Sequence, residues 1–265
     1  MKLIRPQWPV DGRVQACVST RVGGASHGSF RGLNLGDHVG DDPPTVAENR
    51  RRLSEHLALE RPAQWLQQVH GTEVVRAAGT GQVLRADACW SDQPGQACVV
   101  MTADCLPVFF SDGQKVAVAH AGWRGLVAGI LENTLAVFGQ PGRVHCWLGP
   151  AIGPAAFEVG AEVREAFCAA QPQATQAFHA RDAQAGKFFA DLYLLARLRL
   201  EAAGVASVSG GDFCTWSDPE HFYSYRRDGE TGRMASLIWL EKARPATKPC
   251  GRSRRGHRFS YGNLQ

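Results

Sequence analysis

The chain lacks the long apolar segments that would place it in or across a membrane. No run of about 18 apolar residues occurs in its 265 residues, so we expect no membrane-spanning helix. The first residues, MKLIRPQWPVDGR, have neither the apolar core nor the small-residue cleavage site of a signal peptide. We therefore expect a cytoplasmic protein with no membrane partner.

Glycine-rich nucleotide motifs and paired cysteines are also missing. Neither G-x-G-x-x-G nor G-x-x-x-x-G-K-[ST] occurs, which argues against nucleotide binding of those two kinds. The eight cysteines are widely spaced and form no C-x-x-C pair, unlike those of a small disulfide-stapled scaffold. In a reducing compartment we expect most of these thiols to be small buried hydrophobic groups.

The positive charge is confined to one end of the chain. The formal net charge is +4, but residues 242–258 contain seven Lys and Arg and no acid, so the remainder carries about −3. This distribution argues against nucleic acid as a partner of the folded part. We expect residues 1–243 to form one catalytic domain and residues 244–265 to be a mobile basic C-terminal tail.

The order of apolar segments predicts an α+β fold, a mixed α/β sandwich in which mixed sheets have flanking helices. Short apolar runs predict strands at 14–18, at several places between 65 and 120, at 143–149 and at 236–240. Asp112-Gly113 predicts a hairpin. Helices are predicted from Asp41-Asp42-Pro43-Pro44 onward, with Val46, Leu53 and Leu57 on one face, and at 125–138, 160–170 and 187–203.

Three residues at the ends of predicted strands form a candidate metal site. His70, Cys105 and His120 can converge at one sheet edge, and zinc accepts imidazole nitrogen and thiolate sulfur while keeping an open position for substrate. Spacing alone leaves alternatives. Each residue has an ordinary structural role available, and Cys105 with His120 also suits a metal-free nucleophile and base.

A series of motifs resembles the YfiH family, also called the laccase-domain or polyphenol oxidase family. The resemblance runs in order from about residue 15 to residue 240, and only the tail lies outside it. The motifs are STRVGG, LNLGDHVGDD, ENRRRL, QVHGTEV, ADACWSD, TADCLPV, AHAGWRG, GPAIGP and FYSYRRDGETGRMAS.

The resemblance implies a chemistry for the three candidate ligands. In that family the matching residues hold the metal, which implies one zinc per chain bound by His70, Cys105 and His120. It also implies phosphorolysis of adenosine, inosine and methylthioadenosine to the base and a ribose 1-phosphate, with adenosine deamination as a second activity. Purine nucleosides and phosphate are then the expected partners. Some members are linked instead to amide hydrolysis in peptidoglycan precursor editing.

The older family name implies copper and phenol oxidation, which the sequence disfavours. A multicopper oxidase needs many histidines and His-x-His pairs, whereas this chain has nine histidines and no such pair. A site of two His and one Cys can still take copper in vitro, because divalent copper outcompetes zinc at most nitrogen and sulfur sites.

Further polar residues are candidates for binding substrate. Arg50 is expected in the catalytic site, and Arg21 and Arg124 beside it, because guanidinium groups neutralise phosphate. Asn34 is a candidate for binding the base or ribose, and Asp104 for binding substrate or transferring a proton. Each has an ordinary alternative: a solvated or salt-bridged arginine, a turn asparagine, or an aspartate that orients a ligand.

Two readings other than a zinc enzyme stay open at this point. A thiol hydrolase would use Cys105 without metal and needs a low pKa at that thiol. A non-catalytic binding module would use zinc for stability alone, but structural zinc sites normally have four protein ligands and only three are apparent.

Overall fold

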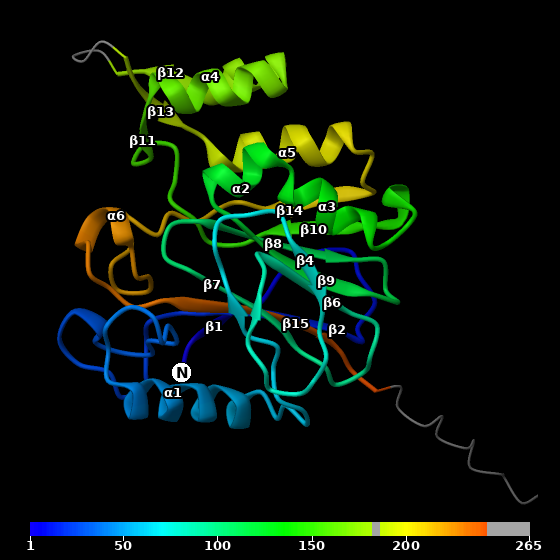
Figure 1. The fold of residues 1–265 in the computed structure, drawn as a ribbon, viewed down its shortest axis with the longest axis vertical. Helices are drawn as coiled ribbons and strands as arrows, with labels where there is room; N and C mark the ends of the chain where they lie inside the picture. Colours follow the sequence, from blue (N-terminus) through cyan, green and yellow to red (C-terminus); the bar gives the residue numbers. More distant parts are fainter. Residues whose placement is uncertain (182–185, 243–265) are drawn as a thin grey trace, which may run out of the picture.

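The computed structural model describes residues 1–181 and 186–242, so the predicted tail at 244–265 lies outside the described residues. Four layers follow one another (Figure 1): helix α1 (Pro43–His56), a four-stranded sheet, a six-stranded sheet, and helices α2 (Trp123–Ala128), α3 (Ile130–Ala136) and α5 (Leu192–Ala202). The predicted α+β sandwich is confirmed.

The two large sheets differ in the direction of their strands. The four-stranded sheet is antiparallel, in the order β1 (Leu3–Ile4), β2 (Val14–Ser19), β15 (Met234–Leu240), β7 (Cys98–Thr102). The six-stranded sheet has a parallel pair at each edge, in the order β14 (Ser207–Gly210), β10 (His145–Leu148), β8 (Leu106–Ser111), β9 (Val116–Ala121), β6 (Ala88–Ser91), β4 (Val74–Arg76).

Smaller elements complete the fold. A parallel pair is formed by β3 (Leu66–Gln67) and β5 (Leu84–Arg85). A three-stranded sheet of β11 (Glu158–Gly160), β13 (Lys187–Ala190) and β12 (Phe178–Ala180) lies with helix α4 (Ala161–Ala170) at the end of the molecule opposite α1 (Figure 1). The short helix α6 (Tyr225–Asp228) precedes β15.

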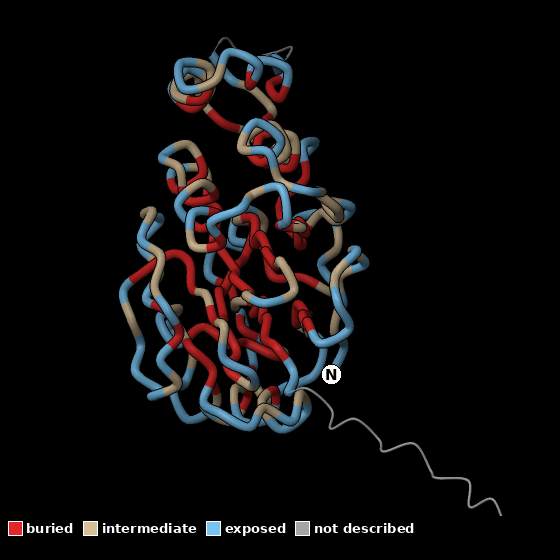
Figure 2. Tube along the Cα trace, turned by 90° about the vertical axis from the view of Figure 1, so that its right-hand side faces the viewer, coloured by how far each residue is buried: buried red, intermediate tan, exposed pale blue. Residues whose placement is uncertain are grey.

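Both large sheets are covered on both faces, which explains their nearly continuous apolar sequences. In β8, Phe109 packs between the sheets and Phe110 packs against the helices; Val118 and Ala119 divide in the same way in β9. The far face of the four-stranded sheet packs on α1 through residues such as Leu237 and Leu53. Buried residues accordingly run through the centre of the molecule (Figure 2).

Several local predictions are confirmed. The Asp112-Gly113 turn joins β8 to β9 as an antiparallel hairpin. Helix α1 begins after Asp42, whose carboxylate accepts a hydrogen bond from the Thr45 N–H. Within the described residues, no helix is both long enough and apolar enough to cross a membrane.

Two helix predictions were wrong in part. The single helix predicted at 125–138 starts at Trp123 and is broken at Gly129, where φ is +103°, so that α2 and α3 are separate. The first part of the helix predicted at 187–203 is instead strand β13, in which Lys187–Ala190 pairs with β11 and β12. Asp191 then caps α5, which begins at Leu192. In both places a local break, a glycine or a capping aspartate, overrides the helical spacing.

The break at Gly129 predicts that Gly129→Ala destabilises the protein through its backbone conformation and not through its packing. A Cβ at Gly129 would meet no atom closer than 3.6 Å, so Gly129→Ala tests the left-handed conformation alone. We expect a loss of about 1–2 kcal/mol in the free energy of unfolding, measured by chemical denaturation. Gly12→Ala, at a site with open space and no positive φ, is the control. An equal change in both variants would contradict the explanation.

Candidate metal centre

The structure brings the three predicted ligands together. His70 lies in the loop after β3, Cys105 immediately precedes β8, and His120 lies in β9. Their ligand atoms are all within 4.8 Å of one another, and Cys105 Sγ is 3.8 Å from His70 Nε2. A tetrahedral zinc with sulfur and nitrogen ligands places such atoms about 3.6 Å apart, so the arrangement fits a metal ion of this size.

Strand pairing explains the convergence of Cys105 and His120. The β8–β9 register places Pro107 opposite His120, which brings the preceding Cys105 to the same end of the sheet. Gly122 then allows His70 to approach, because a Cβ on Gly122 would lie 2.6 Å from His70 Cδ2 and 3.1 Å from Cys105 Sγ. The absence of a side chain at residue 122 is therefore part of the site.

Asp87 holds the two histidine ligands in place and was missed by the sequence analysis. Its fully buried carboxylate accepts a hydrogen bond from His120 Nδ1 at 2.8 Å. The same carboxylate accepts the backbone N–H groups of Val69, His70 and Gly71 at 2.7–3.2 Å. The bond to Nδ1 leaves Nε2 of His120 as the nitrogen available to a metal, which is the usual way a carboxylate orients a histidine ligand.

The backbone around the site is strained in two places. His70 has φ of +59° and Asp104 has φ of +88°, both in the region that L-residues rarely adopt. The three N–H groups bound by Asp87 hold the first conformation. Gln68 also anchors the loop, because its amide pairs with both the N–H and the carbonyl of Met101 in β7. Strain of this kind persists only where neighbouring contacts determine it.

The three residues also adjust one another's charge. Burial raises the pKa of the Cys105 thiol, but the His120 and His70 imidazoles outweigh it and lower the pKa to about 6. Burial lowers the pKa of His120, whereas the Cys105 thiolate and Asp87 raise it to about 9. Cys105 is therefore poised as a thiolate, the form that binds metal.

A cavity of about 380 Å³ opens over the three residues, within the size range of small-molecule sites. Besides the ligands, its wall contains His38, Gln68, Met101, Tyr225 and Arg233. Sequence reasoning missed His38, Tyr225 and Arg233. All three lie in stretches quoted for the family resemblance, but no spacing rule marks an isolated residue in a loop as part of a cavity.

Arg50, predicted as catalytic, lies behind the cavity wall. Its guanidinium makes an ion pair with Asp37 at 3.2 Å, donates to the carbonyl of Leu35 and stacks on the Trp65 ring at 4.0 Å. It also contacts the sulfur of Met101, which lines the cavity. The contacts place Arg50 next to the site with its charge already paired.

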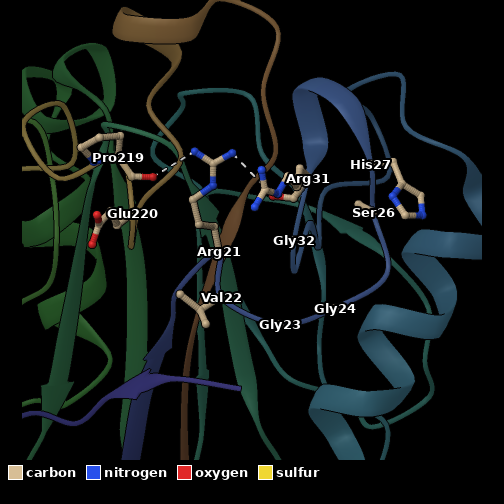
Figure 3. Close-up of a pocket in the computed structure, with 10 residues that line it drawn as sticks. All are labelled: Arg21, Val22, Gly23, Gly24, Ser26, His27, Arg31, Gly32, Pro219 and Glu220. Carbon is tan, nitrogen blue, oxygen red and sulfur yellow. Dashed lines mark hydrogen bonds between the residues drawn. The ribbon is translucent and has the colours of Figure 1, made fainter.

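The other two predicted arginines lie elsewhere. Arg21 lines a separate cavity of about 630 Å³ together with Gly23, Gly24 and Gly32, and it donates to the carbonyls of Pro219 and Arg31 (Figure 3). Arg124 is exposed on α2, with its guanidinium over the Trp123 ring. Neither residue is among those that line the cavity over His70, Cys105 and His120.

Asn34 and Asp104 already use their polar atoms within the protein. The buried amide of Asn34 bonds Gly36, Asp41 and the Arg233 N–H. The carboxylate of Asp104 accepts from Thr215 Oγ1 at 2.6 Å and from the Arg226 N–H at 2.6 Å. Both therefore support the loops around the site, which matches the structural alternative for each.

Comparison with known proteins finds a matching family and similar proteins over nearly the whole chain. Residues 15–241 match the family described as multi-copper polyphenol oxidoreductase laccase. A purine nucleoside phosphorylase of Pseudomonas aeruginosa is 59% identical over 90% of this chain and 98% of its own length. The purine nucleoside phosphorylase YfiH of Escherichia coli is 54% identical over 90% of this chain and 99% of its own.

Solved structures agree with these sequences. A protein of Neisseria meningitidis is 48% identical and superposes with a TM-score of 0.87, covering 91% of this chain and all of its own. YlmD of Geobacillus stearothermophilus is 31% identical with a TM-score of 0.83, again covering 91% of this chain and all of its own.

The role of Asp87 predicts weaker metal binding in Asp87→Asn. The amide nitrogen cannot accept the N–H groups of the His70 loop, and His120 loses a charged acceptor. With Zn²⁺ as the probe ion, we expect its affinity to fall about 10- to 100-fold, measured by competition with a chelator. Asp92→Asn, which removes a half-buried partner of the exposed Arg76 just after β6, should bind as the wild type does. Unchanged affinity in a folded Asp87→Asn protein would refute this role.

Gly122→Ala should damage the site while sparing the backbone. Residue 122 has φ of −63°, which alanine adopts freely, so the added methyl group acts by pushing on His70 and Cys105. We expect Zn²⁺ affinity to fall about tenfold or more, the scale of other disturbances to ligand orientation. Gly142→Ala, where the nearest atom is 3.8 Å away, is the control. Wild-type metal binding in Gly122→Ala would show that the site has room to spare.

Proposed function

The chain belongs to the multi-copper polyphenol oxidoreductase laccase family, and from this we propose that it is a zinc-dependent purine nucleoside phosphorylase acting on adenosine, inosine and methylthioadenosine. The observation that carries the proposal is the convergence of His70, Cys105 and His120 on one cavity, in a chain whose close relatives are named for this activity. Adenosine deamination is a second proposed activity of the same site. We assign residues 1–243 to the catalytic domain and place the activity in the cytoplasm.

Zinc fits the ligand set better than a multicopper centre does. Two imidazoles and one thiolate, with an open fourth position, are typical of catalytic zinc. A multicopper oxidase needs several further histidines in a cluster. In residues 1–181 and 186–242, His70, Cys105 and His120 are the one group of three or more metal-binding side chains that converges. The family description therefore names a chemistry for which the described part of the chain brings together too few ligands.

Phosphorolysis breaks the bond between C1′ of the ribose and the base nitrogen and forms a bond from C1′ to a phosphate oxygen. The products are the free base and ribose 1-phosphate. Positive charge develops on the ribose as the base leaves, while the incoming phosphate is anionic. Zinc held by the three ligands would supply a fixed positive charge for an anionic or hydroxyl oxygen.

The residues of the chain have separate tasks in this proposal. Asp87 fixes His120 with Nε2 toward the metal position, and Gln68 fixes the loop that carries His70. Tyr225 stands at the cavity with 61% of its surface exposed. An exposed aromatic ring beside a polar cavity offers a purine a face on which to stack, so we assign Tyr225 to base binding.

The proposal predicts that metal and activity are lost together. Protein purified without added copper should contain about one zinc per chain and release free base from adenosine and inosine only when phosphate is present. Cys105→Ala should lose the zinc and lower phosphorolysis by at least about 10²-fold, the scale for loss of a main electrostatic contribution in an active site. Cys168→Ala, which removes a thiol on α4, should keep both.

Other outcomes of this measurement point to other functions. Zinc without phosphorolysis would favour the amide hydrolase, which needs the same metal but no phosphate. Activity that survives in metal-free wild type and is lost in Cys105→Ala would favour a thiol hydrolase. A protein that holds no zinc and has no phosphorylase activity would rule the proposal out.

A further inference from the structure

Arg233 presents a positive charge to the metal cavity without an acidic partner. It lies just before β15 and lines the cavity together with the three ligands. Its Nη1 donates to the carbonyls of Thr231 and Gly232 at 2.8 and 3.0 Å. Among the described residues no carboxylate lies within ion-pair distance of Arg233, although it is partly buried. A cation withdrawn from water without a counter-ion is costly, so such a group suits an anionic ligand.

Arg50 differs from Arg233 in that its charge is paired with a carboxylate. Both side chains contact the segment around residues 35 and 36, Arg50 through the Leu35 carbonyl and Arg233 through Gly36, and burial lowers the pKa of each. Arg50 is neutralised by Asp37 at 3.2 Å and covered by the Trp65 ring. Arg233 lines the cavity together with Cys105 instead, and the charges of Cys105 and Asp104 only partly offset the effect of burial on its pKa. Of the two, Arg233 is therefore the one with charge left for a ligand.

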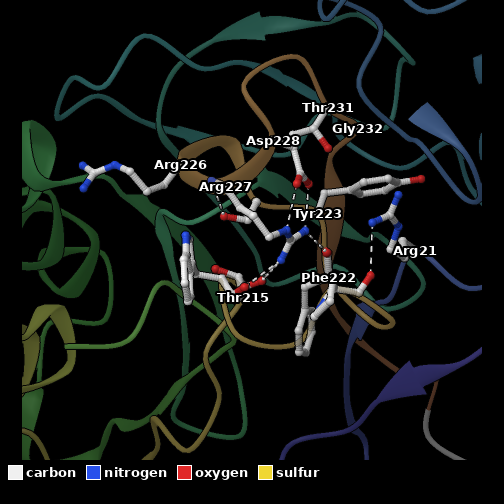
Figure 4. A network of polar contacts seen from close by, with 12 residues as sticks. Arg21, Thr215, Phe222, Tyr223, Arg226, Arg227, Asp228, Thr231 and Gly232 are labelled. Atoms are coloured by element: carbon white, nitrogen blue, oxygen red, sulfur yellow. Dashed lines mark hydrogen bonds and ion pairs between the residues drawn. The ribbon is translucent and has the colours of Figure 1, made fainter. Parts of the chain in front are cut away.

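The position of Arg233 is fixed before any ligand arrives. Its aliphatic stem packs on Gly36, where an added Cβ would lie 2.8 Å from Arg233 Cγ. The segment before it is held by Arg227, which binds the carbonyls of Thr215, Trp216 and Phe222 (Figure 4). Hydrogen bonds in the described residues account for Nη1 alone, which leaves Nη2 and Nε to receive a ligand. A fork held in this way suits the oxygens of phosphate.

His38 adds a second polar group, two residues after the Gly36 on which the Arg233 stem packs. It lines the same cavity, and burial together with the Arg233 charge lowers the pKa of its imidazole below the ordinary value. The Arg233 charge acts on His38 because the two side chains face the same space. His38 Nδ1 lies 3.5 Å from the Asp37 carboxylate. An imidazole beside a guanidinium can donate a hydrogen bond to an oxygen that the guanidinium holds, when the ring nitrogen near that oxygen carries the proton.

We propose that Arg233 and His38 form the orthophosphate subsite of the metal cavity, a refinement that rests on the proposed phosphorolysis. The charges agree with this occupant. Arg233 brings a positive charge to the cavity wall, and among the described residues no carboxylate forms an ion pair with it. An anion is the matching ligand, and phosphate is the anionic substrate of the proposed reaction.

The test measures orthophosphate binding directly, by isothermal titration calorimetry on the protein with its metal in place. Arg233→Met keeps the stem on Gly36 and removes the charge, so we expect the Kd for orthophosphate to rise about 10- to 100-fold, the scale of one charge-assisted hydrogen bond or two. Arg233→Lys keeps the charge and should retain most of the affinity. His38→Gln should raise the Kd by a smaller factor.

Arg197→Met is the matched control. Arg197 also donates to two backbone carbonyls, those of Val208 and Gly210, but it lies outside the cavity on α5. This variant should bind orthophosphate as the wild type does. Metal content and far-UV circular dichroism are measured for every variant, so that a change in Kd is compared between proteins with equal metal.

The outcomes separate this inference from the proposed function. Wild-type affinity for orthophosphate in Arg233→Met, equal loss in Arg233→Met and Arg233→Lys, or no binding by the wild type at millimolar concentration would each overturn it. The inference would also be overturned if Arg233→Met weakened binding of adenosine 5′-monophosphate but not of orthophosphate. Arg233 would then bind the phosphate group of a nucleotide. Loss of orthophosphate binding in a protein that shows no phosphorolysis would support the subsite and reject the proposed reaction.

Discussion

The candidate site depends on one buried carboxylate. Asp87 receives three consecutive backbone N–H groups from the His70 loop and the Nδ1 of His120. Burial raises the pKa of Asp87, but the bonds from His120 and the backbone outweigh it and keep the carboxyl ionised. One side chain thereby fixes two ligands that are 50 positions apart in sequence. Without these hydrogen bonds, the left-handed conformation of His70 would lose contacts that offset its strain.

The fold supplies the rest by placing strand ends side by side. The two sheets are closely packed, and the site lies at one end of them, where β7 ends, β8 begins and β9 ends. The register of β8 on β9 sets the position of Cys105 relative to His120 to within one residue, because a shift by one would turn His120 to the other face of its sheet. The apolar pattern of the strands therefore determines indirectly how Cys105 and His120 are placed relative to each other.

The layers of the fold and the convergence of His70, Cys105 and His120 could be predicted from the sequence, but the residues that support them could not. Strands and the hairpin could be predicted because their apolar runs and turn residues are local signals. The break at Gly129 could not, since a glycine inside a helical pattern is often tolerated. Asp87 and Arg233 left no signal, because each acts through contacts with segments distant in the sequence. Predicted residues such as Asn34 failed to reach the cavity for the opposite reason: local hydrogen bonds had already taken their polar atoms.

Hydrogen bonds connect the candidate ligand Cys105 to the segment that forms another part of the cavity wall. Asp104, next to Cys105, accepts hydrogen bonds from the Thr215 hydroxyl and the Arg226 N–H. Arg227 donates to the carbonyl of Thr215 (Figure 4). The segment tied down in this way carries Tyr225 and leads directly into Arg233. A ligand that contacts these two residues therefore contacts a hydrogen-bonded segment that reaches Cys105 through Asp104. We call this segment the frame. Because the frame is held by ionic and buried hydrogen bonds, it is rigid before the ligand arrives, and binding energy need not be spent on ordering it.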